Sequence, residues 1–391
     1  MKPSVIFFPV DNGDMTLIKL SDKTTILTDI NLREAAENED NPAFDAAAAL
    51  KDHLETDEKK RPYVDVFLLS HPDQDHCRGL KKYFHLGPLS EYNDDPPEED
   101  GLKIVIREIW SSPIIFRRAG KTHTLCEDAK AFSAEAKRRV NIFRNNGTTQ
   151  EGDRILIIGE DENGKTEGLE TILVKIDDIF SKINGKNSNE ISMRVLGPIP
   201  IQEDIEKEEK LGKNHSSVIL QYTFSIDGQE DACLFLSGGD AEVYIWEQVW
   251  ELNKGNTSAI QYDLLMTPHH CSWHSISYDS WSKDENPKPS QDALSALSQA
   301  REGAFIISSS KPIKNDKNDP PCWGAKAEYL SILKSVGGEF FCTGEHPDKE
   351  ATEPLKFTIS AEGPQAPAKK SAAMSGAVIG ARRSREPLYH G

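Results

Sequence analysis

Short apolar runs and longer stretches of helical periodicity alternate along most of the chain, separated by polar, Gly- and Pro-containing segments. Residues 64–69 form a nearly continuous apolar run, which predicts a strand buried on both faces of a mixed or parallel sheet. An Asn-Gly pair at residues 12–13 separates two further apolar segments and predicts a β-hairpin. Further strands are expected at residues 104–110, 193–198, 218–224, 232–237, 262–266 and 304–308. Helices are expected at residues 32–56, 76–85, 124–145, 242–252, 291–301 and 325–336, so the pattern predicts an α/β fold.

The apolar run at residues 64–69 is followed by a loop that contains His71, Asp73, Asp75 and His76. Imidazole nitrogens and carboxylate oxygens this close in sequence can converge on one or two cations. Pro72 restricts the loop, so less entropy is lost when such a site forms. The simpler alternative is a solvated loop that only joins a strand to a helix. We favour metal binding because α/β sheets hold ligands at the carboxyl ends of their strands.

Five blocks of sequence follow one another along the chain. They are Asp11-Asn12-Gly13-Asp14 with Thr25-Ile26-Leu27-Thr28-Asp29, His71-Pro72-Asp73-Gln74-Asp75-His76, Asn214-His215-Ser216, Ser237-Gly238-Gly239-Asp240-Ala241-Glu242, and Thr267-Pro268-His269-His270-Cys271-Ser272. The second block resembles the metallo-β-lactamase-fold signature H-x-[HD]-x-D-H. With Asp at its third position, and with the other blocks, the chain is similar to the ComEC-type branch of DNA-uptake proteins and their stand-alone relatives. The resemblance covers about residues 4–345 with gaps, and departs from the branch at Cys271, where Gly is usual.

The resemblance implies one metallo-β-lactamase-like catalytic domain at residues 1–360, built as a four-layer αββα sandwich. An insertion is expected at about residues 115–195. Beyond residue 360 the composition shifts to Ala, Pro, Gly, Ser, Lys and Arg, which predicts a disordered, flexible and basic tail at residues 361–391.

The resemblance also implies a site for two divalent metal ions, Zn or Mn. The implied ligands are His71 and Asp73 for one ion, Asp75, His76 and His269 for the other, and Asp240 as a bridge. An oxygen-rich set in which Asp replaces one His tilts the preference modestly toward Mn²⁺. Such a pair would activate a hydroxide and clamp an in-line phosphoryl displacement. Asp75, His270 and Ser272 are the expected catalytic residues; His270 and Ser272 could position phosphate or protonate the leaving oxygen, or support the ligands instead.

Three more residues are candidates near this site. Asn214 and His215 stand where related proteins carry a further ligand, and Asn214 matches this branch better. Asp29 ends a predicted strand, and the resemblance implies that its carboxylate orients a ligand His. The alternative for Asp29 is an ordinary loop or helix-capping role.

The net charge of −18 is unusual for a nucleic-acid enzyme, because such proteins generally present a basic surface. The acidic residues cluster at residues 37–40, 94–100, 160–167 and 203–209, which we interpret as solvated loops. The basic residues gather at Arg117-Arg118-Lys121, on the predicted helix 124–145 (Lys130, Lys137, Arg138 and Arg139) and in the tail. This helix could contact phosphates, although a solvated helix face is the commoner explanation.

The six cysteines show no C-x-x-C pairing, which suits packing roles in a reducing compartment. No apolar run approaches the roughly 18 residues of a membrane helix, and the N-terminal apolar segment is too short for a signal peptide. We therefore expect a cytoplasmic protein without a membrane partner.

These observations lead to three hypotheses of function. The first is a metal-dependent phosphodiesterase, specifically a nuclease with nucleic acid as substrate and a protein partner. The second is a metallohydrolase of a small substrate, such as a cyclic nucleotide, ester or amide, which the acidic composition favours. The third is a non-catalytic metal-binding interaction module.

Overall fold

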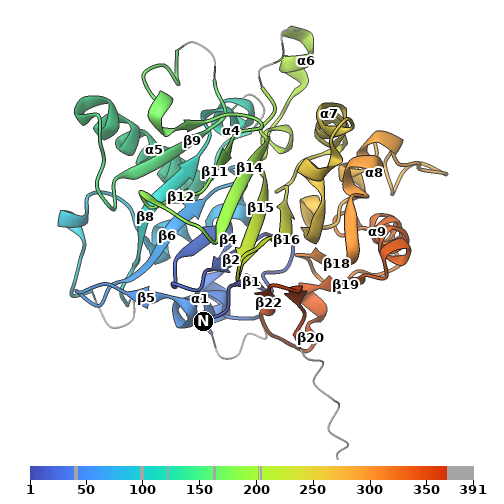
Figure 1. Cartoon of the computed structure of the whole chain (residues 1–391), viewed down its shortest axis with the longest axis horizontal. Helices are drawn as coiled ribbons and strands as arrows, with labels where there is room; N and C mark the ends of the chain where they lie inside the picture. Colours follow the sequence, from blue (N-terminus) through green and yellow to red (C-terminus); the bar gives the residue numbers. More distant parts are fainter. Residues whose placement is uncertain are drawn as a thin grey trace, which may run out of the picture.

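Two β-sheets lie face to face at the centre of the molecule, with helices on both outer sides (Figure 1). The computed structural model describes residues 1–38, 43–96, 101–120, 123–161, 164–200, 202 and 205–367. The first sheet has the order β10 (Leu173–Val174), β9 (Arg154–Ile158), β8 (Ile104–Ser111), β6 (Pro62–Leu68), β3 (Thr25–Thr28), β2 (Thr16–Lys19), β1 (Ser4–Phe7), β22 (Leu355–Ser360) and β23 (Gly363–Gln365), with β5 (Glu55–Thr56) on β6 and β7 (Phe84–His85) on β8. The second has the order β11 (Ile179–Phe180), β14 (Ile191–Gly197), β15 (Ile219–Ile226), β16 (Gln229–Ser237), β17 (Tyr262–Met266), β18 (Ala300–Ser308) and β19 (Glu339–Cys342).

Helices and small hairpins complete the described chain. The α-helices are α1 (Ala46–His53), α2 (Gln74–Cys77), α3 (Leu80–Tyr83), α4 (Pro113–Ala119), α5 (Glu127–Asn146), α6 (Ile205–Lys210), α7 (Val243–Asn253), α8 (Gln291–Leu297) and α9 (Trp323–Val336). Short 3-10 turns are η1 (Glu34–Glu37), η2 (Leu89–Glu91), η3 (Glu170–Ile172), η4 (Asn214–Ser216), η5 (Thr257–Ile260), η6 (Pro268–His270), η7 (Trp273–Ser275) and η8 (Thr343–Glu345). The hairpins pair β12 (Lys182–Ile183) with β13 (Lys186–Asn187) and β20 (Pro347–Asp348) with β21 (Ala351–Thr352), and β4 (Ile30–Asn31) bridges to residues 77–78.

Strand direction places several chain segments at one edge of the sandwich. In the first sheet β3 and β6 are parallel, with Ile26 opposite Val66. In the second sheet β16 and β17 are parallel, with Phe235 opposite Leu264. Because parallel strands end at the same edge of a sheet, the loops that follow each pair become neighbours.

The core between the sheets is held by aromatic and aliphatic side chains from both. Phe7 of the first sheet meets Phe235 of the second edge-to-face, with ring centroids 5.6 Å apart, and Tyr222 stacks on Phe235 at 5.4 Å. Such pairs add about 0.5–1.5 kcal/mol each to the burial of apolar area. The two sheets therefore pack directly on each other.

Helices cover the outer face of each sheet (Figure 1). Phe132 of α5 packs on Phe67 of β6, with ring centroids 5.7 Å apart. A second buried cluster joins the outer face of the second sheet to α7, α8 and α9, and contains Trp246 and Tyr329. The α/β fold class and the four-layer αββα sandwich predicted from the sequence are confirmed.

Some elements differ from the predicted pattern. The helix expected at residues 76–85 is two short helices, α2 and α3, because the chain turns at Gly79 with a φ of 92°. The stretch at residues 115–195 contributes β9 and β14 to the two main sheets, so much of the expected insertion is part of the sandwich. At the other end, β23 extends the first sheet beyond residue 360.

Several predicted features lie outside the described residues. They are parts of the acidic loops (residues 39–40, 97–100, 162–163 and 203–204), Lys121, and residues 368–391 of the predicted tail. None of the described helices has the length and apolarity needed to cross a bilayer.

Candidate metal centre

Acidic and imidazole side chains from four separate loops meet at the edge where β3, β6, β16 and β17 end. One set, here called the inner group, is fully buried and consists of Asp14, His76, Asp240 and His270. The other set, the outer group, consists of His71, Asp73 and Asp240. Within each group one ligand atom per residue lies within 4.8 Å of the others, and Asp240 belongs to both.

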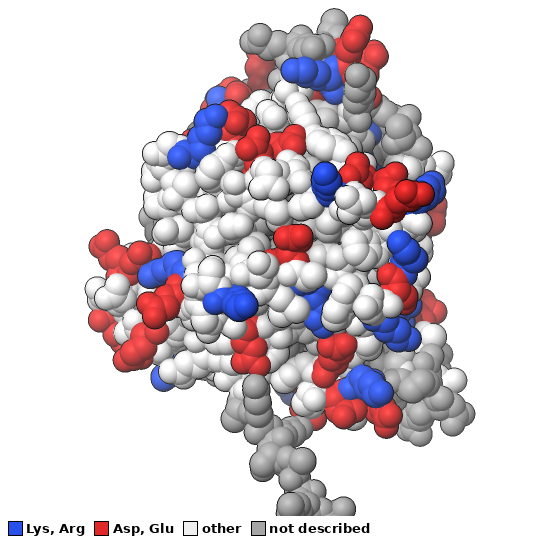
Figure 2. Space-filling model, turned by 90° about the vertical axis from the view of Figure 1, so that its right-hand side faces the viewer, with Lys and Arg blue, Asp and Glu red and all other residues white. Residues whose placement is uncertain are grey.

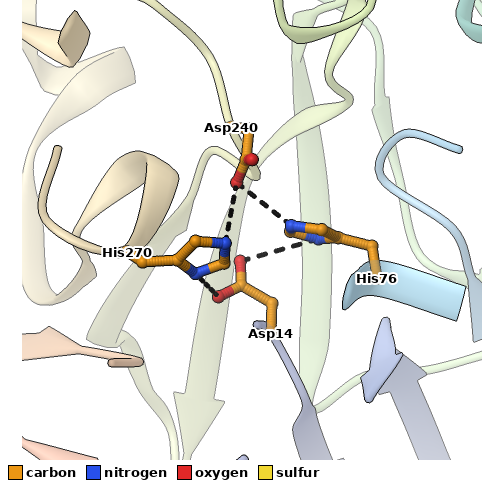
Figure 3. A group of neighbouring side chains, drawn as sticks. All are labelled: Asp14, His76, Asp240 and His270. Atoms are coloured by element: carbon orange, nitrogen blue, oxygen red, sulfur yellow. Dashed lines mark ion pairs between the residues drawn. The ribbon is translucent and has the colours of Figure 1, made fainter. Parts of the chain in front are cut away.

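The inner group surrounds a common point (Figure 3). Nε2 of His76 lies 3.1 Å from Oδ1 of Asp240, and Nε2 of His270 lies 3.6 Å from the same oxygen. Nδ1 of His270 lies 3.2 Å from Oδ1 of Asp14. The four side chains come from the β1–β2 turn, α2, the end of β16 and η6, so the group forms only when both sheets are packed.

The outer group lies on the other carboxylate oxygen of Asp240. Nε2 of His71 is 3.4 Å from Oδ2 of Asp240 and 3.8 Å from Oδ2 of Asp73. Asp240 thus directs Oδ1 toward the inner group and Oδ2 toward the outer group. This is the placement that a carboxylate bridging two cations requires.

In the part of the chain that the structure describes, most of the buried ligand atoms in the two groups lack the hydrogen bonds that buried polar atoms normally form. Within the described residues, seven buried atoms have no hydrogen-bond partner: both oxygens of Asp14, Oδ1 of Asp240, Nε2 of His71 and of His76, and both nitrogens of His270. They approach one another at ion-pair distance but without hydrogen-bond geometry. Ligand atoms about 2.1 Å from a tetrahedral ion lie roughly 3.4 Å from each other, and the contacts to Asp240 in the inner group span 3.1 to 3.6 Å. Because leaving buried polar atoms unpaired is costly, these residues fit a divalent cation.

The charge balance of the site follows from the same contacts. Burial disfavours the charged form of His71 and of His270, yet Asp240 raises the pKa of His71 to about 9 and that of His270 to about 10. Against the same cost of burial, Asp240 also raises the pKa of His76 well above its ordinary value. At neutral pH the metal-free rings therefore hold protons that a metal would have to displace.

The pKa values of the carboxylates of Asp73 and Asp240 shift in the opposite direction, below their ordinary values. Burial raises the pKa of Asp73, but His71 and Lys213 outweigh it and lower the pKa to about 2. Burial also raises the pKa of Asp240, but the surrounding histidines outweigh this effect and hold the pKa well below its usual range. Both carboxylates are thus ionised and ready to bind a cation at neutral pH.

Asp29 fixes the orientation of His76. Its Oδ2 lies 2.8 Å from His76 Nδ1, and its Oδ1 accepts a hydrogen bond of 2.7 Å from the backbone N–H of Ser70. Because Nδ1 faces Asp29, Nε2 is left to face Asp240. The structure therefore brings Asp29 into contact with His76, a predicted ligand, and not to a helix terminus.

Two glycines allow the loops to approach this closely. A Cβ at Gly13 would lie 2.3 Å from Nδ2 of Asn31 and 2.8 Å from the backbone oxygen of Asp75. A Cβ at Gly239, which has a φ of 49°, would lie 2.8 Å from Oγ of Ser70. Any larger residue at Gly13 or Gly239 would push the loop of Asp14 or of Asp240 away from the segment that follows β6, residues 70–76.

The two adjacent histidines of η6 occupy different positions. His269, His270 and Cys271 have φ values of 52°, 54° and 66°. This left-handed backbone turns His270 into the inner group. His269, predicted as a ligand, lies with Nε2 3.5 Å from Oδ2 of Asp240 but belongs to neither group. Cys271 is buried in the cluster behind the second sheet, so it does not crowd the approach to the site.

The remaining sequence candidates lie around the groups. Asp75 has Oδ2 3.3 Å from Nε2 of His270 and is 34% exposed. Ser272 instead donates a hydrogen bond of 2.7 Å to Asp319. Asn214 and His215 both face Glu242, at 2.8 and 3.6 Å, and the structure does not bring them to either group.

Two residues of the site were missed by sequence reasoning. Asp14 was part of a recognised block but was not proposed as a ligand, although a carboxylate directly after the Gly of a tight turn was a usable signal. Lys213, which precedes the Asn214 block, contacts Asp73 with its ammonium group and is 29% exposed.

Comparisons with known proteins give only distant similarities. No protein-family model and no curated protein matches the sequence. A solved diphosphatase from the PhnP family is 8% identical, with a TM-score of 0.33, over 89% of this chain and 85% of that one. Unliganded yeast PDE1 is 13% identical, with a TM-score of 0.36, over 88% of this chain and 97% of that one. At these identities and TM-scores neither similarity establishes an activity for this chain.

Proposed function

We propose that the chain is a metal-dependent phosphodiesterase that holds one divalent ion in the inner group and one in the outer group, with Asp240 between them. The observation that carries this proposal is the set of buried ligand atoms on both sides of Asp240 that lack a hydrogen-bond partner among the residues the structure describes. A structural role does not account for them, because buried carboxylates and imidazoles in a structural network are normally hydrogen-bonded.

The neighbouring side chains suit phosphoryl chemistry. Divalent ions bound at such a site lower the pKa of a water and neutralise charge on a phosphoryl oxygen. Lys213 is 29% exposed beside Asp73 and can bind a non-bridging oxygen of the substrate. His269 is 18% exposed, and its Nε2 lies 3.5 Å from Oδ2 of Asp240. Its position beside the outer group makes it a candidate to give a proton to the leaving oxygen.

Within the phosphodiesters, the resemblance to ComEC-type proteins favours nucleic acid as substrate, which would make the enzyme a nuclease. In this proposal the ions could be Zn²⁺ or Mn²⁺, and a protein partner would bring or orient the nucleic acid. The blocks around His71–His76 and Asp240 carry this resemblance.

A second candidate, a small phosphodiester such as a cyclic nucleotide, is favoured by the positions of the basic residues. Arg139 is buried and bonded to Glu135 at 2.8 Å, and Arg138 pairs with the same carboxylate at 2.7 Å. The predicted phosphate-contacting helix face is thus largely committed to internal ion pairs. On the face of α7, α8 and α9, acidic and basic side chains are interspersed without a continuous basic patch (Figure 2). With a net charge of −18, attraction of a long polyanion to the molecule as a whole is not expected.

The proposal is tested by metal analysis and a substrate panel on the same protein. The purified chain is loaded with Zn²⁺ or Mn²⁺, its metal content is measured, and bis(p-nitrophenyl) phosphate, single-stranded DNA, RNA, cyclic AMP and p-nitrophenyl acetate are offered. Asp240→Asn is the test variant. Asp227→Asn is its matched control, because Asp227 lies in an exposed turn.

We expect two metal equivalents and cleavage of at least one phosphodiester, reduced at least about a hundredfold in Asp240→Asn and unchanged in Asp227→Asn. Cleavage of DNA or RNA would select the nuclease, and cleavage of cyclic AMP alone the small-substrate enzyme. Cleavage of p-nitrophenyl acetate alone would overturn the proposal in favour of an esterase, and metal binding without cleavage of any of the five substrates would overturn it in favour of a non-catalytic metal-binding module.

A further inference from the structure

A cavity of about 400 Å³ lies between α4 and α5, and none of its lining residues belongs to the inner or outer group. Its floor is apolar, formed by Phe116 of α4, Val140 of α5, Ile157 of β9 and Leu169. Phe116 and Val140 are half-buried, whereas Ile157 and Leu169 are buried, so only part of the apolar floor is open to solvent. Its volume falls within the roughly 300–1,000 Å³ of small-molecule sites.

The rim of this cavity is basic. It is lined by Arg117, Lys137, Arg144 and Lys165, and the described lining residues include no carboxylate. Arg117 and Lys165 share Asp161, at 2.7 and 3.0 Å. In contrast, Lys137 and Arg144 form no ion pair with a carboxylate in the described ranges, and Arg144 donates only to backbone oxygens. Among the described residues, two positive charges at the rim are therefore left without an acidic partner.

The spacing of residues along α5 explains how this one helix supplies both the apolar floor and the basic rim of the cavity. Lys137, Val140 and Arg144 are three and four residues apart, so they lie on the same face of α5. An apolar contact is thus placed between two cations. A ligand that fills this arrangement needs an apolar body long enough to cover Val140 and an anionic group that reaches the rim.

We propose that this cavity is a second ligand site, separate from the metal centre, for a small amphiphilic anion with an aromatic or alicyclic body and one carboxylate, sulfonate or phosphate group. Charge complementarity argues against the chain's own C-terminal segment as occupant, because Lys369, Lys370 and Arg382 would meet the basic rim. The proposal does not depend on the activity of the metal centre.

The test uses 8-anilinonaphthalene-1-sulfonate, whose fluorescence rises on transfer to an apolar site, and the neutral N-phenyl-1-naphthylamine, which lacks the sulfonate. Both are titrated into the full-length chain. We expect one saturable site per chain for the sulfonate and roughly tenfold weaker binding of the neutral probe. Sedimentation of the same sample shows whether a second copy competes for the cavity, and concentration-dependent loss of probe binding would overturn a small-molecule site.

Two variants locate the probe. Lys137→Glu reverses one of the two rim charges. It is expected to weaken binding of the sulfonate probe roughly tenfold and to leave the affinity for the neutral probe unchanged. Lys334→Glu on α9, also exposed, is the matched control and should change neither. Val140→Trp fills the floor and should abolish binding of both probes. If Val140→Trp fails to fold, Lys137→Glu alone decides, because its side chain is exposed; equal sulfonate affinity in Lys137→Glu and Lys334→Glu would overturn the proposal.

Discussion

Asp29 and His76 form a buried pair in which Oδ2 of Asp29 lies 2.8 Å from Nδ1 of His76. This contact leaves the opposite ring nitrogen free to face Asp240, 3.1 Å away. A residue outside both groups therefore determines how a proposed ligand, His76, is oriented. Carboxylates in this position raise the basicity of a ligand imidazole and fix its tautomer.

Asp29→Asn should therefore weaken metal binding without unfolding the chain. Asn retains an acceptor for the N–H of Ser70 and tolerates the φ of 54° at this position. We expect a loss of about 10- to 100-fold in affinity, measured by competition with a chromogenic chelator. Asp227→Asn, at an exposed position with a φ of 52°, is the control for the substitution itself. Equal affinities in the two variants would show that Asp29 does not orient the ligand.

Gly13→Ala should damage both the fold and the inner group. The added Cβ would lie 2.3 Å from Asn31 and 2.8 Å from the backbone of Asp75, and backbone cannot move aside as a flexible side chain can. We expect the free energy of unfolding to fall by about 1–3 kcal/mol, together with weaker metal binding. Gly255→Ala, where no heavy atom lies within 4 Å of the new Cβ, is the control. Urea denaturation of both proteins measures the difference, and a Gly13→Ala midpoint equal to that of Gly255→Ala would contradict it.

The raised histidine pKa values predict opposite pH responses of the metal-free and metal-loaded protein. The pKa is about 9 for His71 and about 10 for His270, against about 6.5 in an unfolded chain. The stability that these protonated rings supply is fully present below about pH 6.5 and is lost as the pH rises through 9 to 10. The thermal midpoint in EDTA should thus fall between pH 7 and 9, while metal affinity rises because fewer protons must be displaced. A thermal midpoint of the metal-free protein that rises between pH 7 and 9 would show that protonated His71 and His270 do not stabilise the fold.

Cys126 should be the most reactive of the cysteines. Its Sγ lies 3.6 Å from that of Cys77, whose hydrogen bond lowers the pKa of Cys126 to about 6. Burial raises the pKa of Cys233 and Cys271 well above the ordinary value. Because the thiolate is the nucleophile, brief treatment with iodoacetamide at pH 7 should alkylate Cys126 first, as read by peptide mass spectrometry. Cys77→Ala should slow this alkylation; an unchanged rate would mean that the Cys77 thiol does not stabilise the thiolate.

Much of the architecture could be predicted from the sequence because strands buried on both faces appear as apolar runs. The run expected at residues 262–266 is β17, and the apolar segment before His71 is β6. The polar loop after β6 was equally visible, because H-x-D-x-D-H places its candidate ligands within a few residues. These features are local in the chain, so local pattern is sufficient to find them.

Features that depend on tertiary packing could not be predicted in the same way. The choice between His269 and His270 depends on consecutive left-handed residues, which no side-chain pattern indicates. Asp14 lies in a turn, where carboxylates are usually solvated, and only the packing of the two sheets buries it. Arg139 was expected on a solvated or phosphate-contacting helix face but is buried against Glu135, since its long side chain reaches back into the core.

The central claim is that Asp240 joins two metal positions, and anomalous diffraction from crystals soaked in Mn²⁺ tests it most directly. We predict two anomalous peaks, one beside His71 and Asp73 and the other beside Asp14, His76 and His270, with one oxygen of Asp240 toward each. Crystals that bind Mn²⁺ only elsewhere, or that show no peak beside Asp240, would contradict the account.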